Sequence, residues 1–269
     1  MYKCWACSST VCKGEDGKIV CANCGLTYWT EHRENDYNSA YQDSTTLYNK
    51  YLLYFPKIHD QNINIFKKIN PVESLAVDSL SKIKPDTHVD IGCGVGRFLR
   101  AISETGIQSA GVEKSEHLVD LLRNKGYSCA HDMTQVPNLV NVGDNVSVSL
   151  FEVIEHVTEP EKFLLEIINF FKPNYLAISV PNSLERRRFD PNFKQQDRPP
   201  NHLSRWSQKS LYSLFSNLQD YCVSVKKVPP SRKELVHALL KGNFKSVYVH
   251  LYALIWRPRY WYFCELKRK

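Results

Sequence analysis

Residues 88–98 read His-Val-Asp-Ile-Gly-Cys-Gly-Val-Gly-Arg-Phe, and this stretch decides the fold class of the chain. A short apolar strand ends in the acid Asp90. Three glycines follow at alternate positions, Gly92, Gly94 and Gly96. Glycine permits a tight turn and a close approach of the backbone to a ligand. The next residues alternate apolar and polar at helical spacing, so the loop leads into a helix N-terminus with free N–H groups. The pattern predicts a nucleotide cradle at the switch point of a doubly wound sheet.

The segments on either side alternate between strand-like and helix-like patterns, which argues for a parallel sheet with helices on both faces. Further strands are expected at 108–113, 127–130, 146–151, 175–180, 221–228 and 260–266. Helices are expected at 71–83, 97–103, 158–171 and 207–218. For the third of these helices, Thr158 with Glu161 predicts a capping box, and Pro160 suits the first turn.

Acidic residues stand near the ends of the second and third expected strands. Glu113 ends the second strand, at an offset where an acid accepts hydrogen bonds from ribose hydroxyls in nucleotide-binding folds. A solvated strand-end glutamate is the alternative. Asp132 and Met133 follow the third strand, and Asp132 is equally compatible with a turn or a helix cap.

A carboxylate and histidine cluster follows the fourth strand, across the switch point from the glycine loop. Glu152, Glu155 and His156 stand at i, i+3 and i+4, so a helical turn would bring them to one face. His156 titrates in a range that suits a general base. Alternatively the three are metal ligands with His202 as a fourth, a set that suits magnesium or manganese. A third interpretation, a solvated acidic turn with a structural histidine, also remains open.

These segments resemble the class I S-adenosylmethionine-dependent methyltransferases over roughly residues 75–266. The glycine loop resembles their first motif, and the Glu-Val-Ile-Glu-His string looks like that of the ubiquinone-type O-methyltransferases. It also looks like that of the metal-dependent 2′-O-methyltransferases of small-RNA 3′ ends, which have a later histidine where His202 stands. The resemblance implies an α/β fold with a Rossmann-like, seven-stranded, mostly parallel sheet, helices on both faces and a final antiparallel hairpin.

The resemblance also implies a cofactor and its binding residues. S-adenosylmethionine has a cationic amino-acid tail and a sulfonium, and the resemblance implies that Asp90 lies opposite these charges. It also implies that Asp132 bonds the adenine amino group. The implied cofactor-binding residues are Asp90, Gly92, Cys93, Gly94, Gly96, Glu113, Asp132, Met133 and Phe151. Cys93 is expected to fill space in the loop.

Methyl transfer is an in-line displacement, so the acceptor must be held in line and a hydroxyl acceptor needs a base. We expect His156 to be that base, with Glu152, Glu155 and His202 orienting the acceptor or holding a metal. The expected acceptor is a small molecule, namely a hydroxyl of a saccharide or another biosynthetic intermediate. The alternatives are RNA 2′-O-methylation, sugar C-methylation and a catalytically silent zinc-ribbon binding module.

Two cysteine pairs near the N-terminus predict a structural metal site. Cys4-x-x-Cys7 and Cys21-x-x-Cys24 make two knuckles, and tetrahedral zinc takes four thiolates from two such turns. Cys12 lies between the pairs and is expected to be a spectator. The total of nine cysteines is odd, which argues against a disulfide framework.

The domain organisation follows from these motifs. Residues 1–30 are expected to form the zinc ribbon, 31–70 an aromatic-rich helical linker or cap, and 71–269 the methyltransferase domain. Within that domain we expect a lid loop at about 181–206, which carries an arginine triplet, and a helical insertion at about 231–256. The aromatic rings either pack the ribbon against the main domain or cover the cofactor cleft.

The bulk properties set few limits on the partners. A net charge of +7 and a pI near 8.8 are compatible with RNA or a phosphate-bearing substrate and require neither. The apolar segment 246–256 is too short to span a membrane, so we expect a docked helix, or one at a membrane surface. Because residues 1–20 lack the apolar region of a signal peptide, we expect a cytoplasmic protein. The oligomeric state stays open.

Overall fold

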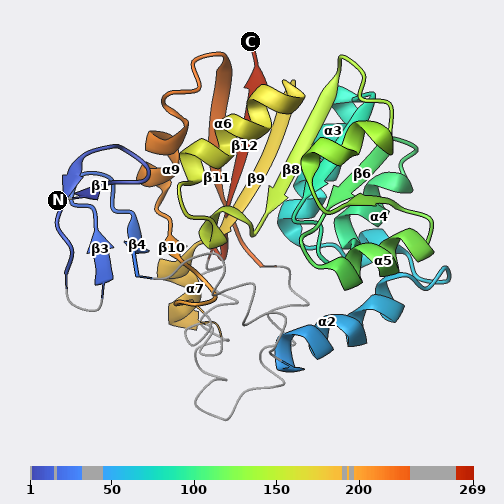
Figure 1. Ribbon diagram of the computed structural model, residues 1–269, viewed down its shortest axis with the longest axis horizontal. Helices are drawn as coiled ribbons and strands as arrows, with labels where there is room; N and C mark the ends of the chain where they lie inside the picture. The colour runs from blue at the N-terminus through green and yellow to red at the C-terminus, as the bar shows by residue number, and fades with distance from the viewer. Residues whose placement is uncertain (1, 15–16, 32–44, 190–192, 194–196, 231–258) are drawn as a thin grey trace.

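The computed structural model describes residues 2–14, 17–31, 45–189, 193, 197–230 and 259–269. Its centre is a seven-stranded sheet in the order β11-β12-β9-β8-β5-β6-β7 (Figure 1). The strands are β5 Thr87–Ile91, β6 Gln108–Val112, β7 Ser128–Ala130, β8 Val146–Phe151, β9 Tyr175–Pro181, β11 Tyr221–Val228 and β12 Trp261–Arg268.

The pairing confirms the mostly parallel sheet. Strand β5 pairs in parallel with both β6 and β8, and β9 pairs in parallel with β8. Strand β12 is antiparallel to β9 and β11, which makes the expected final hairpin. Every residue of β5 is buried, as expected for a strand covered on both faces. The chain order reverses between β5 and β8, so the loops after these two strands meet at one edge of the sheet.

Helices cover both faces, as predicted (Figure 1). On one face α6 and α9 share a buried cluster with β8, and on the other α3 and α4 share one with β12. The helix bounds are α3 Pro71–Ile83, α4 Arg97–Ser103, α5 Glu116–Asn124, α6 Pro160–Phe171 and α9 Gln208–Phe215. Helix α3 begins with a capping box, in which Asn70 accepts from the Glu73 N–H and the Glu73 carboxylate accepts from the Asn70 N–H.

The helix predicted to open at Thr158 begins two residues later. Helix α6 begins at Pro160, and Glu159 occupies the N-cap in a left-handed conformation with φ 51° and no side-chain cap.

The predicted lid loop at 181–206 also contains regular structure. Helix α7, Ser183–Phe189, follows β9 directly, and the short strand β10, Ser204–Arg205, ends the segment. The arginine triplet lies on α7. The helical insertion expected at 231–256 lies outside the described residues.

The N-terminal segment forms four short strands, β1 Tyr2–Lys3, β2 Thr10–Val11, β3 Lys18–Val20 and β4 Thr27–Trp29. Strands β3 and β4 make a three-stranded sheet with β10, in the order β10-β4-β3. A strand from the end of the lid segment is thus part of the ribbon's own sheet. We call residues 2–31 the ribbon.

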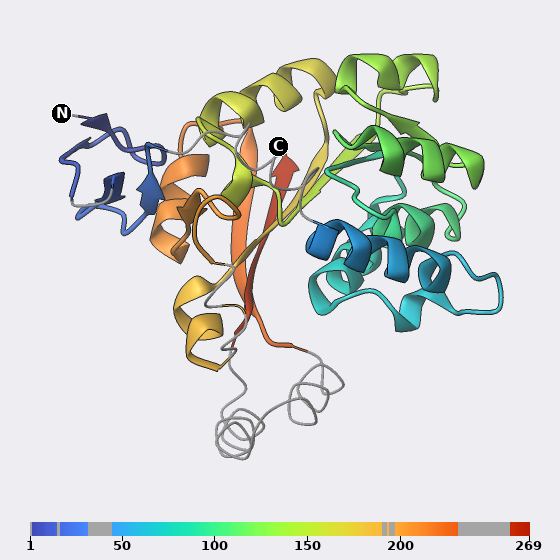
Figure 2. The ribbon, with the colours of Figure 1, turned by 60° about the horizontal axis from the view of Figure 1, so that its bottom comes forward.

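Helix α2, Thr45–Ile58, and the short helix η2, Ile65–Lys67, follow the ribbon in the chain. Figure 2 shows α2 and the ribbon on opposite sides of the central sheet. Phe55 of α2 is buried in one cluster with Val95, Ala101 and Leu118. This ring therefore packs beside the glycine loop, rather than joining the ribbon to the main domain.

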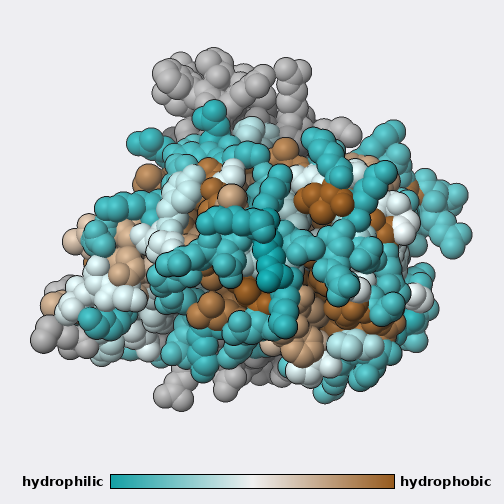
Figure 3. Space-filling model, turned by 90° about the horizontal axis from the view of Figure 1, so that it is seen from above, coloured by the Kyte–Doolittle hydropathy of each residue, from teal (hydrophilic) through white to brown (hydrophobic). Residues whose placement is uncertain are grey.

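Among the described residues, no helix has both the length and the apolar character needed to cross a membrane. Figure 3 shows the face seen from above, where hydrophilic residues cover most of the coloured surface and the hydrophobic areas are small and separated. That face presents no large apolar patch among the residues drawn in colour.

Candidate active site

The three glycines of the loop after β5 have positive φ angles of 72°, 53° and 74° at Gly92, Gly94 and Gly96. L-residues avoid this conformation, so the loop requires glycine. Two of the three also have close neighbours: a Cβ at Gly92 would lie 2.6 Å from Val153 Cγ2, and one at Gly96 would collide with Leu122. A Cβ at Gly94 would meet nothing within 4 Å. Gly94 therefore faces the open space in which a ligand can approach the backbone.

Glu113 follows β6 and holds this loop. Its Oε2 accepts from the Gly94 N–H at 2.9 Å, and its Oε1 accepts from the Ser115 N–H at 3.0 Å. Burial raises the pKa of Glu113 above its ordinary value. The predicted ribose-binding acid thus lies directly beside the glycine that faces open space.

Asp90 lies in β5 at the base of the loop and is 3% exposed. Ser149 of β8 donates to its Oδ1 at 2.6 Å. Burial raises the pKa of Asp90 to about 7, because a carboxylate loses its water there. A cation bound beside Asp90 would favour the ionised form.

Asp132 lies at a helix cap, which was one of the two alternatives open from the sequence. It is exposed, and its Oδ1 accepts from both the N–H and the hydroxyl of Thr134 at the start of the short helix η3, Met133–Asn138. Met133 is half-buried against the main core cluster. The adenine contact of Asp132 therefore stays a prediction.

Cys93 and Phe151 pack into the interior. The Cys93 Sγ lies 3.9 Å from that of Cys129, and both thiols are buried, as expected for a space-filling residue. Phe151 ends β8, where its ring meets Phe98 edge-to-face with centroids 4.7 Å apart. Phe98 belongs to α4, so this contact joins the end of β8 to the helix that follows the glycine loop.

Glu152 lies near the other members of the predicted cluster but outside the group of potential ligand atoms that they form. Its φ is +58°, and the helical turn η4, Ile154–His156, begins only two residues later. The i, i+3, i+4 face expected from the sequence therefore does not form from Glu152. Its carboxylate instead accepts from Ser179 Oγ at 3.2 Å and lies 3.8 Å from Arg186 Nη1.

Glu155, His156 and His202 come together. One potential ligand atom of each lies within 4.8 Å of the others. Glu155 is fully buried, and neither oxygen of its carboxyl group has a hydrogen-bond partner in the described structure. Burial, with the nearby Glu152, raises the Glu155 pKa well above its ordinary value. A buried carboxyl without a partner is costly, so the site needs a proton, a cation or a ligand there.

Hydrogen bonds to the Nδ1 atoms orient both imidazoles. The Nδ1 of His156 bonds the carbonyl oxygen of Asn201, and the Nδ1 of His202 lies 3.0 Å from Asp197 Oδ1. Since both partners are acceptors, each Nδ1 carries a proton, and in a neutral ring the lone pair then lies on Nε2. Burial and the neighbouring His202 lower the pKa of His156 to about 3. The low pKa keeps the His156 ring neutral and makes it a weak base in the ligand-free site, and a neutral ring can bind a cation through Nε2.

Sequence reasoning missed Asp197. Its carboxyl group is fully buried and lies 3.0–3.2 Å from His202, Arg187 and Arg205. Ser183 also donates to it, at 3.0 Å. Asp197 stands in a polar stretch with no strand or helix periodicity, so no pattern distinguished it from a solvated loop residue.

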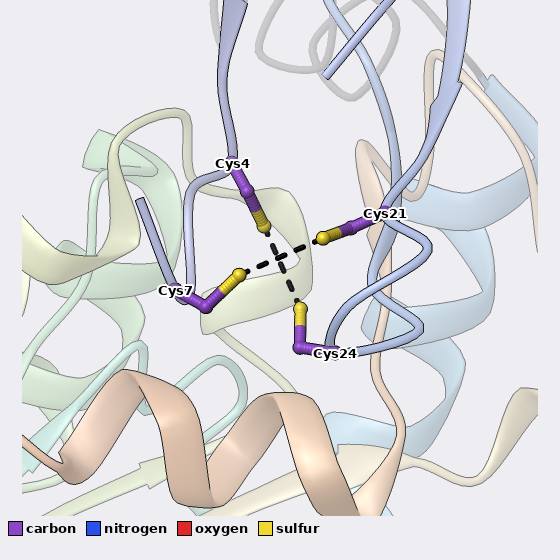
Figure 4. Close-up of side chains that lie close together, drawn as sticks. All are labelled: Cys4, Cys7, Cys21 and Cys24. Atoms are coloured by element: carbon purple, nitrogen blue, oxygen red, sulfur yellow. Dashed lines mark hydrogen bonds between the residues drawn. The ribbon is translucent and has the colours of Figure 1, made fainter. Parts of the chain in front are cut away.

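The four cysteines of the ribbon point toward one another from two turns (Figure 4). The Sγ atoms of Cys4 and Cys24 are 3.6 Å apart, as are those of Cys7 and Cys21. Four thiolates around a zinc ion at about 2.3 Å have S–S distances of about 3.8 Å, so this cluster fits a zinc site. Cys12 is exposed and lies outside the cluster.

Comparison with protein families agrees with this geometry. A family model described as "Methyltransferase domain" matches residues 67–223, more than half of the chain. The ubiquinone biosynthesis O-methyltransferase of Coxiella burnetii is 24% identical over 110 residues, which are 39% of this chain and 47% of that protein. The protein of the same name from Methylococcus capsulatus is 23% identical over 120 residues, or 42% and 51% of the two chains. The chain thus spans about half the length of these curated relatives.

Solved structures share the fold. The plantazolicin methyltransferase BpumL superposes with a TM-score of 0.52 at 15% identity, covering 88% of this chain and 95% of that one. A SAM-dependent methyltransferase from Archaeoglobus fulgidus gives 0.50 at 18% identity, with coverage of 81% and 99%. The methyltransferase domain of bacterial CtHen1 gives 0.50 at 14% identity, with coverage of 72% and 96%. The chain belongs to the methyltransferase-domain family, and its fold is that of the class I S-adenosylmethionine-dependent methyltransferases.

Proposed function

We propose that this protein transfers a methyl group from S-adenosylmethionine to an acceptor held by Glu155, His156 and His202. One observation carries the proposal: Gly92 of the glycine loop packs directly against Val153 in the turn that bears the cluster. The two loops follow adjacent parallel strands, β5 and β8. A donor on the first loop therefore lies next to an acceptor on the second, as an in-line displacement requires.

The residues of the glycine loop fit the cofactor. S-adenosylmethionine supplies a methyl group activated on a sulfonium. Gly94 leaves room for it to approach the backbone, Glu113 is placed to accept hydrogen bonds from ribose hydroxyls, and Asp90 offers a carboxylate to a cationic group. In our proposal Asp90 binds as the ionised form, although burial favours its protonated form when no cation is present.

The acceptor side fits a hydroxyl group. In our proposal the Nε2 of His156 takes the hydroxyl proton while His202 orients the acceptor. Burial lowers the His156 pKa to about 3, so this step requires the adjacent Glu155 to be ionised and to stabilise the imidazolium. The Coxiella relative is named an O-methyltransferase, which supports an oxygen acceptor. The acceptor class we propose is a hydroxyl of a saccharide or another biosynthetic intermediate.

A labelled-methyl assay tests this proposal. Tritiated S-adenosylmethionine is incubated with the protein and with a small-molecule extract, and the labelled products are separated. His156→Ala should abolish labelling, while His117→Ala, which removes an exposed histidine from α5, should leave it unchanged. Full labelling by His156→Ala would remove this histidine from the mechanism.

A metal-assisted RNA 2′-O-methyltransferase is the second candidate. The buried and unpartnered Glu155 beside two imidazoles favours it, because these three groups would suit magnesium or manganese. On this alternative, chelation abolishes transfer, manganese restores it, and the label enters an RNA fraction with steep salt dependence. Transfer into small molecules that resists chelation supports the first candidate.

A further inference from the structure

The structure points to a positioning function for the segment 197–205, which we call the strap. We infer that Asp197 orients His202 and that the ribbon holds the strap against η4, Ile154–His156, which we call the catalytic turn. This inference rests on the proposed function, since it gives His202 a place in the acceptor site.

Leu203 joins the ribbon to the catalytic turn through its backbone. Its N–H donates to the carbonyl oxygen of Glu155 at 2.8 Å, and its own carbonyl oxygen accepts from the N–H of Trp29 at 3.1 Å. The next two residues, Ser204 and Arg205, form strand β10 and pair with β4 of the ribbon. The ribbon, the strap and η4 therefore lie side by side.

Side chains at and just beyond the C-terminal end of β10 strengthen this connection. The Arg205 guanidinium lies 4.6 Å from the centre of the Trp29 ring, and it also contacts the Asp197 carboxylate at 3.0 Å. Two residues after β10, Ser207 Oγ donates to the carbonyl oxygen of Cys24 at 2.8 Å. Cys24 is one of the four clustered cysteines, so the chain just beyond the strap is hydrogen-bonded directly to a turn of the cysteine cluster.

Asp197 connects these contacts between the strap and the ribbon to the imidazole of His202. With its carboxyl group fully buried and between Arg187 and Arg205, it accepts from His202 Nδ1. That hydrogen bond fixes the ring's tautomer and leaves Nε2 directed away from Asp197. The carboxylate acts on the reaction only through His202, so Asp197 is a positioning residue. A residue that only stabilised the strap would not change the His202 tautomer when it is substituted.

Nitrogen NMR of protein labelled in its histidine rings tests the role of Asp197. His202→Gln assigns the His202 signals, and the full-length wild type should show a proton on Nδ1. Asp197→Asn should convert a large fraction of His202 to the Nε2–H tautomer, while calorimetric affinity for S-adenosylhomocysteine changes less than twofold. Glu265→Gln makes the same carboxyl-to-amide change at a buried acid on β12, and it should leave the His202 signals unchanged.

A folded Asp197→Asn protein with an unaltered His202 tautomer would overturn the role of Asp197. Arg205→Ala and Arg187→Ala then distinguish the contribution of the ribbon from that of α7. Both variants remove a cation from Asp197, but of the two arginines only Arg205 contacts Trp29 of the ribbon. The larger change of the His202 signals should come from Arg205→Ala. An equal or larger change from Arg187→Ala would contradict a ribbon contribution.

The failure of this inference is distinct from the failure of the proposed function. The tautomer is measured without any acceptor, so it reports on the strap alone. If His202→Gln transfers label as well as wild type, the proposed acceptor site is wrong even where the tautomer behaves as expected.

Discussion

Ser149 of β8 donates a hydrogen bond to Asp90 of β5 across 2.6 Å, inside the sheet and directly below the glycine loop. This contact holds a carboxyl group whose pKa burial raises to about 7. The cofactor-free protein therefore keeps at its centre an acid that is unfavourable when ionised. A bound cation would relieve that cost.

The first prediction concerns stability and pH. Between pH 4 and pH 7 the folded state keeps the Asp90 proton while the unfolded chain loses it, so folding stability falls as pH rises. The full cost, up to about 4 kcal/mol, is present above pH 7. Asp90→Asn should therefore raise the melting temperature of the cofactor-free protein at pH 8 and have little effect at pH 4.

Glu265→Gln is the control of opposite sign. Burial alone would raise the pKa of Glu265, but hydrogen bonds from Lys226 and Ser79 lower it below the ordinary value. Its ionised form therefore stabilises the fold, and that stability is lost as pH falls through the lowered pKa. Glu265→Gln should lower the melting temperature at pH 8. If Asp90→Asn and Glu265→Gln changed the melting temperature at pH 8 in the same direction, the environments assigned to these two acids would be wrong.

The second prediction is that substitutions at Gly94 and Gly96 have different effects, the first mainly on cofactor binding and the second mainly on stability. Gly94→Ala adds a methyl group to open space, so the protein should fold with a loss of about 1 kcal/mol from the positive φ. Its calorimetric affinity for S-adenosylhomocysteine should fall at least tenfold, because the methyl group occupies the proposed cofactor space. Gly96→Ala collides with Leu122 and should unfold at a clearly lower temperature. Wild-type affinity in Gly94→Ala would remove this face from the cofactor site.

The third prediction concerns the ribbon. Purified protein should contain one zinc ion per chain by elemental analysis, and Cys21→Ser should lose most of it because a three-thiolate site binds more weakly. Cys12→Ser is the matched control and should keep its zinc, since Cys12 is exposed and outside the cluster. Equal loss of zinc from both variants would contradict the assigned ligands.

The fourth prediction concerns Glu155. Its fully buried carboxyl group has no hydrogen-bond partner, so the cofactor-free site is costly to form. Glu155→Gln removes the ionisable group, and we expect a melting temperature at pH 8 equal to or above that of wild type together with the loss of methyl transfer. Glu116→Gln, an exposed change on α5, should alter neither. Retained transfer in a stable Glu155→Gln protein would exclude a role in acceptor binding.

The sequence predicts the fold well because its elements depend on local patterns. The glycine loop, the helix at 71–83 and the strand at 146–151 all follow from residues that are neighbours in the chain. The helix predicted to open at Thr158 instead begins at Pro160, because the residue before it, Glu159, is left-handed. The start of this helix depends on the backbone conformation that follows the preceding turn, and the local sequence pattern does not predict that conformation.

The site is only partly predictable for the same physical reason. Glu155, His156 and His202 were identified from spacing and resemblance, and the fold brings them together. Asp197 and the strap were not, because their contacts join segments that are distant in sequence. Strand β10 has only two residues, and it pairs with a strand about 175 positions earlier, so it has no signature of its own.

The most direct test of the central claim is methyl transfer from tritiated S-adenosylmethionine by the wild type and by His202→Gln. We expect labelled small molecules with the wild type. We expect the loss of labelling in His202→Gln, with S-adenosylhomocysteine affinity within twofold of wild type. Undiminished labelling by His202→Gln would contradict the placement of the acceptor between the catalytic turn and the strap.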